Sequence, residues 1–187
     1  MSRKLVIGLM LFMFLPFQGT AKEVSGAEIP EKLERAGITF VLNGAGIRSR
    51  FFVNIYVSAL YLEDRSQDSE KILRDDRNMG IRLQIVSGFV DQDNLKSAIK
   101  DGFESATGGN TQPIQPQIER FLELMSDEVN KGDYFDFIYL QSSGLRVYKN
   151  DTFLEDIKGL NFKRAFFGIW LGDDPVDDDL KEEMLGL

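Results

Sequence analysis

Two arginines and a tyrosine lie close together in an apolar stretch of the sequence. Arg48, Arg50 and Tyr56 follow the period of two that places side chains on one face of a β-strand. An arginine guanidinium is always charged, and its planar fork fits carboxylate or phenolate oxygens. A tyrosine hydroxyl adds a neutral hydrogen-bond donor. These residue types are suited to holding the anionic head of a ligand.

A straight strand would keep Arg48 and Tyr56 apart, because eight extended residues span about 26 Å. The two side chains can hold one ligand head only if the chain bends sharply between Ser49 and Phe52. The alternative is that Arg48 pairs with a carboxylate at the sheet edge and Tyr56 is a half-buried sheet residue. Arg82, on the next predicted strand, belongs either to the same cleft wall or to an exposed polar face. The sequence leaves both questions open.

The sequence contains no histidine and no cysteine. Ser-His-Asp and Cys-His nucleophilic sites are therefore excluded, as are the usual His- or Cys-ligated zinc, copper, haem and iron–sulfur centres. Tyrosine, lysine, arginine and carboxylates remain for proton chemistry, and no disulfide can form. The aspartates between 173 and 179 lack the spacing of a calcium-binding loop, so helix capping and solvation explain them better. We expect no metal and no cofactor.

The periodicity of the chain predicts an α+β fold. Strands are expected at residues 38–42, 48–62, 81–89, 134–140, 145–148 and 153–157, with a turn at Asn43-Gly44. Helices are expected from Asp91 or Asp93 to Gly108-Gly109, from near Pro116, over residues 162–170, and from Asp174-Pro175. Residues 22–30 are predicted as a mobile terminus and 64–78 as a surface helix or helical loop. Because strands and helices are grouped, the sheet should be antiparallel.

The first residues have the pattern of an export signal. A basic start precedes an apolar run at residues 5–17, and Gly19-Thr20-Ala21 supplies small residues at a signal peptidase site. We expect residues 1–21 to be cleaved, residues 22–187 to form one domain, and the protein to be periplasmic or secreted, with no stable membrane anchor after cleavage. The alternative is an uncleaved anchor, for which the apolar run is short.

The charge of the chain argues against polyanionic partners. The net charge is −8, and signal cleavage would make it more negative by removing Arg3 and Lys4. A surface of this sign repels nucleic acid and anionic membranes, so we expect no nucleic-acid binding.

Two segments of the chain resemble the chalcone isomerase-like family: residues 43–62, NGAGIRSRFFVNIYVSALYL, and residues 166–175, FFGIWLGDDP. In that family a Gly-x-Gly-x-Arg turn leads into a central strand, and the second segment is similar to the tail of its exported bacterial branch. The resemblance runs from about Ile38 to the C-terminus. It implies an open-faced β-sandwich, in which helices cover one face of a large antiparallel sheet and an apolar ligand cleft lies between them.

The resemblance also implies roles for particular residues. Arg48 matches the turn arginine, which helps to hold the substrate in the plant enzymes. Tyr56 falls where the fatty-acid-binding branch has a tyrosine that holds a carboxylate together with an arginine. The plant enzymes carry threonine there, so Tyr56 favours binding. Their catalytic tyrosine and lysines come from a segment that here has no tyrosine and only Lys96 and Lys100, and their late polar pair has no convincing match near 161–164.

Three functions remain open at this point. The first is binding of a small apolar or amphipathic ligand with an anionic head, such as a fatty acid, by Arg48, Tyr56, Arg50 and Arg82, with no catalytic residue assigned. The second is an intramolecular lyase of the chalcone isomerase type, which needs positioning and electrostatics more than a strong base. The third is an envelope interaction protein in which the cleft is vestigial. The sequence does not separate the first from the third.

Overall fold

The computed structural model describes residues 21–90 and 92–187. The predicted export signal thus lies outside the described residues, apart from its last position, and so does Asp91, one of the two predicted helix caps. Within the described ranges, no helix is both long enough and apolar enough to cross a membrane.

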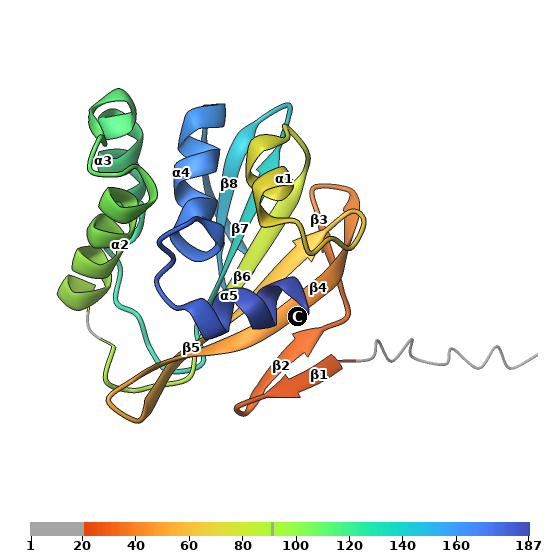
Figure 1. Ribbon diagram of the computed structural model, residues 1–187. Coiled ribbons are helices and arrows are strands. Elements are labelled where there is room, and N and C mark those ends of the chain that lie inside the picture. Colours follow the sequence, from red (N-terminus) through yellow and green to blue (C-terminus); the bar gives the residue numbers. More distant parts are fainter. Residues whose placement is uncertain (1–20, 91) are drawn as a thin grey trace, which may run out of the picture.

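Seven strands form one antiparallel sheet, in which each strand pairs with the next along the chain (Figure 1). They are β3 (Lys32–Arg35), β4 (Ile38–Arg50), β5 (Val53–Leu62), β6 (Met79–Ile85), β7 (Tyr134–Leu140), β8 (Gly144–Lys149) and β9 (Thr152–Ile157). This arrangement confirms the predicted α+β class and the antiparallel sheet.

Five helices pack mainly against one face of this sheet (Figure 1). They are α1 (Ser69–Arg74), α2 (Gln92–Ala106), α3 (Gln115–Leu124), α4 (Leu160–Leu171) and α5 (Asp178–Leu185), and a 3-10 turn (Gln112–Ile114) precedes α3. Aromatic side chains dominate the core between the two layers. Phe166 of α4 packs edge-on against Phe121 of α3 and Phe137 of β7, with ring centroids 5.1 and 5.0 Å away. The predicted open-faced sandwich is therefore present.

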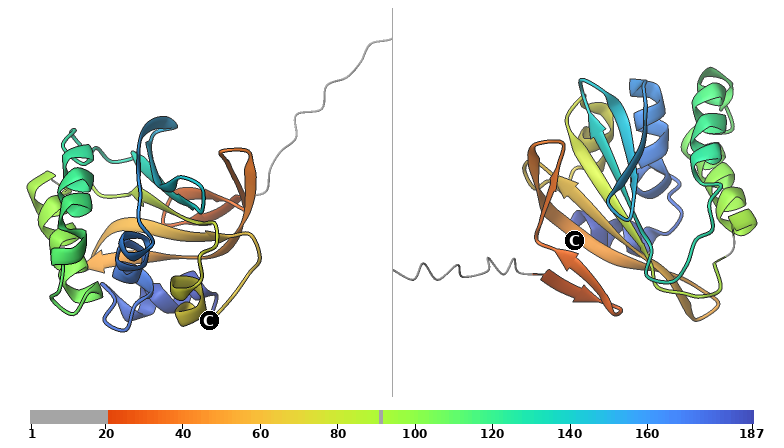
Figure 2. Two further views of the ribbon diagram at one scale, coloured as in Figure 1. Left: turned by 90° about the horizontal axis from the view of Figure 1, so that it is seen from above. Right: turned by 180° about the vertical axis from the view of Figure 1, so that it is seen from behind.

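A small hairpin covers part of the opposite face of the sheet. It consists of β1 (Ala21–Val24) and β2 (Ala27–Pro30), and both views in Figure 2 set it apart from the helical layer. Ala27 and Ile29 are fully buried in a second core that includes Phe40 and Tyr61, and the Tyr61 hydroxyl donates to the Pro30 carbonyl at 2.7 Å. The prediction of a mobile terminus at 22–30 is wrong, because alternate residues of this segment are apolar and find a partner surface.

Residues 38–62 form one hairpin, which corrects two predictions. The predicted turn at Asn43-Gly44 lies inside β4, where a bulge between Leu42 and Gly44 shifts the register with β5. The predicted strand over 48–62 is interrupted by a two-residue turn at Phe51 and Phe52, whose φ angles are +49° and +66°. Such turns usually contain Asn-Gly. Two phenylalanines continue the strand pattern instead, so the sequence carried no turn signal.

The glycines of β4 let α5 approach the strand closely. A methyl group on Gly44 would meet the backbone carbonyl of Glu183 and lie 2.7 Å from that of Met184. Asn43 adds hydrogen bonds, because its amide nitrogen donates to the carbonyls of Ser66 and Met184 at 2.9 and 3.0 Å. The Gly-x-Gly pattern therefore fixes the position of α5.

A buried lysine joins two of the helices. Lys163 of α4 is fully buried, and its ammonium donates to the carbonyls of Ile72, Leu73 and Asp75 at 2.7, 3.0 and 2.9 Å. These carbonyls lie at the C-terminal end of α1, where a cation complements the helix dipole. Burial lowers the pKa of Lys163 to about 8. Its contacts assign this lysine to the support of α1.

Candidate functional site

Arg48 and Tyr56 lie directly opposite each other on β4 and β5. The turn at Phe51 and Phe52 supplies the sharp bend that the two residues need in order to meet. Residues directly opposite in an antiparallel pair have Cα atoms about 4.5–5.5 Å apart and project from the same face. Arg48 and Tyr56 are therefore neighbours across the hairpin, although they are eight positions apart in the sequence.

The Arg48 guanidinium is partly occupied by protein groups. Its Nη1 donates to Asp177 Oδ2 and to the Ser49 carbonyl, both at 2.8 Å. Among the described residues, its Nε and Nη2 groups have no hydrogen-bond acceptor. Arg48 and Asp177 are both half-buried, so the pair is reached by solvent. Donors are thus available on Arg48 for an external anion.

The Tyr56 hydroxyl is a neutral donor. Its oxygen accepts a hydrogen bond from Trp170 Nε1 at 3.2 Å, and in the described part of the chain its own proton has no acceptor. Burial of the hydroxyl raises the pKa of Tyr56 to about 12, although the charge of nearby Arg48 acts in the opposite direction. Tyr56 therefore stays protonated at neutral pH and can donate to a carboxylate.

An apolar cavity of about 60 Å³ begins at the Tyr56 ring. It lies between the sheet and helices α2, α3 and α4, and its walls include Leu83, Leu95, Phe135 and Trp170. Tyr56 is the one titratable residue among its described lining residues. The same side chain thus lines the apolar cavity and belongs to the polar site around Arg48.

Arg82 lies away from Arg48 and Tyr56. Its neighbours Ile81 and Leu83 are buried toward the helices, so its own side chain projects from the opposite face of the sheet. There its Nε and Nη2 donate to Asp136 Oδ1 and Oδ2 at 2.7 and 2.8 Å. Arg35 also donates to Asp136, at 2.9 Å. This cluster occupies Arg82.

Arg50 lies at the exposed end of the β4–β5 hairpin. Its guanidinium carbon is 5.4 Å from the centre of the Phe51 ring. The structure therefore brings together two of the four predicted ligand-binding residues, Arg48 and Tyr56, and places Arg50 and Arg82 elsewhere.

Asp177 is a site residue that the sequence did not reveal. The final helix was expected to start at Asp174-Pro175, but α5 begins at Asp178, with Asp177 as its N-cap and Oδ1 accepting from the Leu180 amide at 3.1 Å. An aspartate before a helix is a recognisable cap. Nothing in its spacing shows that its second oxygen pairs with Arg48.

Ser58 of β5 carries a buried hydroxyl without a partner among the described residues. It is fully buried, and its hydroxyl is the one buried side-chain oxygen or nitrogen in the described ranges without a hydrogen-bond partner. Ser58 lies two residues after Tyr56 and so projects from the same face of β5. A buried polar group left unpaired calls for an explanation, but Ser58 is not among the described residues that line the apolar cavity.

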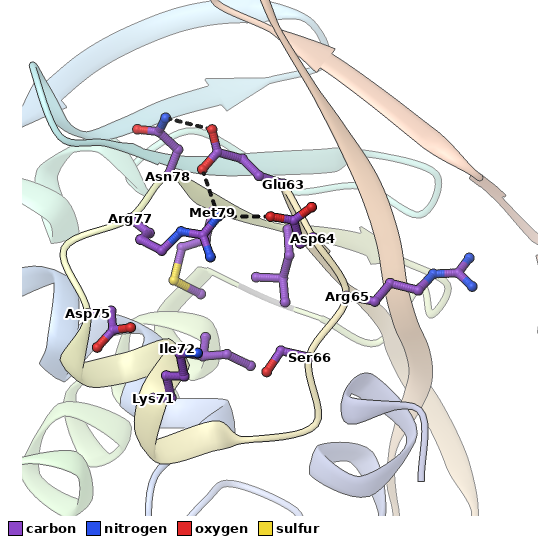
Figure 3. A pocket seen from close by; sticks show the side chains of 11 residues that line it. Glu63, Asp64, Arg65, Ser66, Lys71, Ile72, Asp75, Arg77, Asn78 and Met79 are labelled. Atoms are coloured by element: carbon purple, nitrogen blue, oxygen red, sulfur yellow. Dashed lines mark hydrogen bonds and ion pairs between the residues drawn. The ribbon is translucent and has the colours of Figure 1, made fainter.

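A larger hollow of about 190 Å³ is lined by α1 and by the loops before and after it (Figure 3). Arg77 pairs there with Asp64 at 3.0 Å and Glu63 at 3.7 Å, and Asn78 donates to Glu63 at 3.2 Å. Figure 3 shows these four side chains gathered on one side, whereas Arg65 extends away. Because Arg77 is already held by two carboxylates and Arg65 points away, this hollow is the weaker candidate for an anionic ligand.

The fold and the site together define an α+β protein in which helices cover one sheet face and an apolar cavity begins beside an arginine and a tyrosine. The sequence matches the family described as chalcone isomerase-like over residues 21–186. The chain therefore belongs to the chalcone isomerase-like family, as its two motifs predicted.

The fold also occurs in a solved structure that has little sequence identity with this chain. The crystal structure of a fatty-acid binding protein from Arabidopsis thaliana aligns with a TM-score of 0.69 and 16% identity, covering 90% of this chain and 96% of that chain. At this identity the similarity shows the fold alone. A search of curated proteins found no match.

Proposed function

We propose that this protein binds a small amphipathic carboxylate, such as a fatty acid, and does not transform it. The observation that carries the proposal is the cross-strand pair of Arg48 and Tyr56. Arg48 supplies charge-assisted donors and Tyr56 a neutral one, which together suit a carboxylate. The Arabidopsis protein that shares this fold is a fatty-acid binding protein, which supports the same ligand class.

The apolar part of the ligand enters the cavity behind the Tyr56 ring. The cavity holds about 60 Å³, whereas sites for small molecules usually measure about 300–1,000 Å³. A long acyl chain therefore requires the helical layer to open. Helix α2 is the element suited to move, because Phe103 is its one fully buried side chain among the described residues, and Leu95 and Ile99 are half-buried.

The chemistry of the cavity wall supports binding rather than catalysis. Tyr56 has a pKa of about 12 and is a poor base at neutral pH. Lys96 and Lys100 line a different, open groove between α2 and α3. The two lysines of the segment that corresponds to the catalytic segment of the plant enzymes are thus separate from the cavity.

We also propose that the protein acts outside the cytoplasm and belongs to the exported bacterial branch of the family. The basic start, the apolar run at 5–17 and the small residues before Lys22 support export. Cleavage at that point would leave residues 22–186 of the matched range.

The proposal predicts that Arg48→Met weakens laurate binding by about 10–150-fold, because a hydrogen bond to a charged group contributes about 1.5–3 kcal/mol. Tyr56→Phe removes a neutral donor and should cost about 2–10-fold. Isothermal titration of delipidated protein measures both. The matched control is Arg146→Met, which removes an arginine paired with Asp156 at 2.7 Å on β8 and β9. Absence of laurate binding by the unmodified protein, or equal losses in Arg48→Met and Arg146→Met, would contradict the proposal.

Asp177 competes with the proposed ligand for Arg48. Asp177→Asn keeps an efficient helix cap but removes the carboxylate that pairs with the guanidinium. We expect laurate to bind about tenfold more tightly, a gain of about 1.4 kcal/mol. The same titration measures this change, and dodecanol serves as the uncharged comparison. A similar gain for dodecanol would show that the charge of Asp177 is not the cause.

A further inference from the structure

Three phenylalanine side chains project into solvent at one end of the sheet. Phe51 and Phe52 are 83% and 106% exposed, and Phe89 is 83% exposed. The first two form the β4–β5 turn, and Phe89 lies in the loop after β6 (Figure 1). Tyr56, near the start of β5, pairs with Ile85 at the end of β6, so the turn and the loop leave the sheet at the same end. We call Phe51, Phe52 and Phe89 the aromatic end.

The turn at Phe51 and Phe52 is unfavourable in two respects. Both residues have positive φ angles, +49° and +66°, a region that bulky residues rarely occupy and that this turn normally fills with Asn-Gly. Both also expose an apolar ring to water. Among the described residues, the Phe51 ring has one ring contact, with the Arg50 guanidinium, and the Phe52 ring has none. The fold gains little from these side chains, which points to a surface outside the protein that covers them.

The charge near the aromatic end differs from that of the whole chain. The net charge is −8, yet no acidic residue occurs between Glu34 and Glu63, and the charged residues nearest to the turn along the sequence are Arg48 and Arg50. Residues 78–90 also contain no acidic residue, although Asp91 and Asp93 follow directly in the sequence. The turn therefore combines exposed aromatic rings with the guanidinium of Arg50, which lies against Phe51, whereas Arg48 is paired with Asp177 and Arg82 with Asp136. Such side chains bury their apolar parts in an interface and keep their charged heads near lipid phosphates.

The shape and size of the aromatic end favour a bilayer over a protein partner. Three phenylalanines offer roughly 450–750 Å² of contact, which is below the 800 Å² or so that each partner buries in a standard protein interface. The side chains also come from a projecting turn and a loop. A projecting group of this area can enter a bilayer interface, where no complementary pocket is needed.

We propose that the aromatic end inserts into the interfacial region of a lipid bilayer. This docking does not depend on the proposed ligand, but the two features are adjacent. Leu95, in the first turn of α2, lines the apolar cavity and follows Phe89 by six residues. A docked protein would hold the cavity close to a surface into which amphipathic carboxylates partition.

Vesicle flotation with the purified protein tests the docking. The vesicles contain phosphatidylcholine alone, so that net lipid charge does not contribute. The decisive variant carries Phe51→Asn and Phe52→Gly, which removes both rings and supplies the residues that the turn prefers. We expect its partition coefficient to fall at least tenfold, while its thermal unfolding midpoint stays equal or rises. A loss of binding in a variant of undiminished stability cannot be due to misfolding.

Two further variants complete the experiment. Phe89→Ser should weaken vesicle binding in the same direction. Leu187→Ser removes an exposed apolar side chain at the C-terminus, which lies beside Asn43 and away from the turn, and should bind as the unmodified protein does. The proposal is overturned if the unmodified protein does not float with the vesicles, or if the double variant floats equally well. Self-association without vesicles that the double variant abolishes would also overturn it, by assigning the aromatic end to a second copy of the chain.

Discussion

Replacing Asp136 with alanine is expected to lower the free energy of unfolding by about 3–5 kcal/mol, because removal of one partner leaves buried charge uncompensated. Asp136 is fully buried, and its two oxygens accept from Arg82 and Arg35. Without the carboxylate, two largely buried guanidinium groups would lack their common partner. Urea unfolding followed by circular dichroism measures the change.

Asp156→Ala is the matched control for this prediction. It removes the bidentate partner of Arg146, but both members of that pair are more accessible to water. Exposed pairs contribute about 0–1 kcal/mol, so the control should differ little from the unmodified protein. Equal losses in the two variants would contradict the importance that we give to burial of the Asp136 cluster.

A variant of Arg82 distinguishes a structural role, through its pairing with Asp136, from a role in ligand binding. Because Arg82 projects from the sheet face opposite the cavity, Arg82→Met should destabilise the protein without changing the laurate affinity of the folded fraction. Titration of Arg82→Met with laurate, without urea and at a temperature well below its unfolding midpoint, separates the two effects. A selective loss of laurate affinity would return Arg82 to the ligand-binding residues.

Replacing Gly44 with alanine is expected to cost about 3 kcal/mol of stability, at the upper end of the usual cost of overpacking. The added methyl would meet the backbone carbonyls of Glu183 and Met184, and a helix backbone cannot move aside as a flexible side chain can. Helix α5 would have to shift as a unit. Since Asp177 caps that helix, the shift should also weaken its contact with Arg48.

Gly88→Ala provides the control for Gly44→Ala. A methyl on Gly88 has no atom within 4 Å, so its effect should stay within about 0.5 kcal/mol. Urea unfolding of both variants gives the comparison. A change below 0.5 kcal/mol in Gly44→Ala would show that α5 adapts easily, and the structural reason for the Gly-x-Gly pattern would then be wrong.

The proposed ligand and the aromatic end make separate demands on the protein. Laurate titration tests Arg48, Tyr56 and Asp177, whereas vesicle flotation tests Phe51, Phe52 and Phe89. A protein that binds laurate but not vesicles would keep the proposed function and lose the docking. The reverse result would keep the docking and leave the cavity without its proposed ligand.

Patterns within a few neighbouring residues determined much of this fold. The predicted strand at residues 134–140, a nearly continuous apolar run, matches β7, Tyr134–Leu140, and helical spacing located α4, which covers the core. The grouping of strands and helices predicted the antiparallel sheet. The residues around Arg48 and Tyr56 indicated both the family and the chemistry of the site. Such signals depend on local backbone geometry, which a sequence records directly.

Tertiary structure alone decided how the candidate site is assembled. The bend at Phe51 and Phe52 has no turn residues, so only strand pairing shows that Arg48 faces Tyr56. Asp177 pairs with Arg48 across 129 positions of the chain, and Asp136 pairs with Arg82 on the other sheet face across 54. These contacts depend on which elements pack together and in which register, and a local pattern of residue types does not encode that choice.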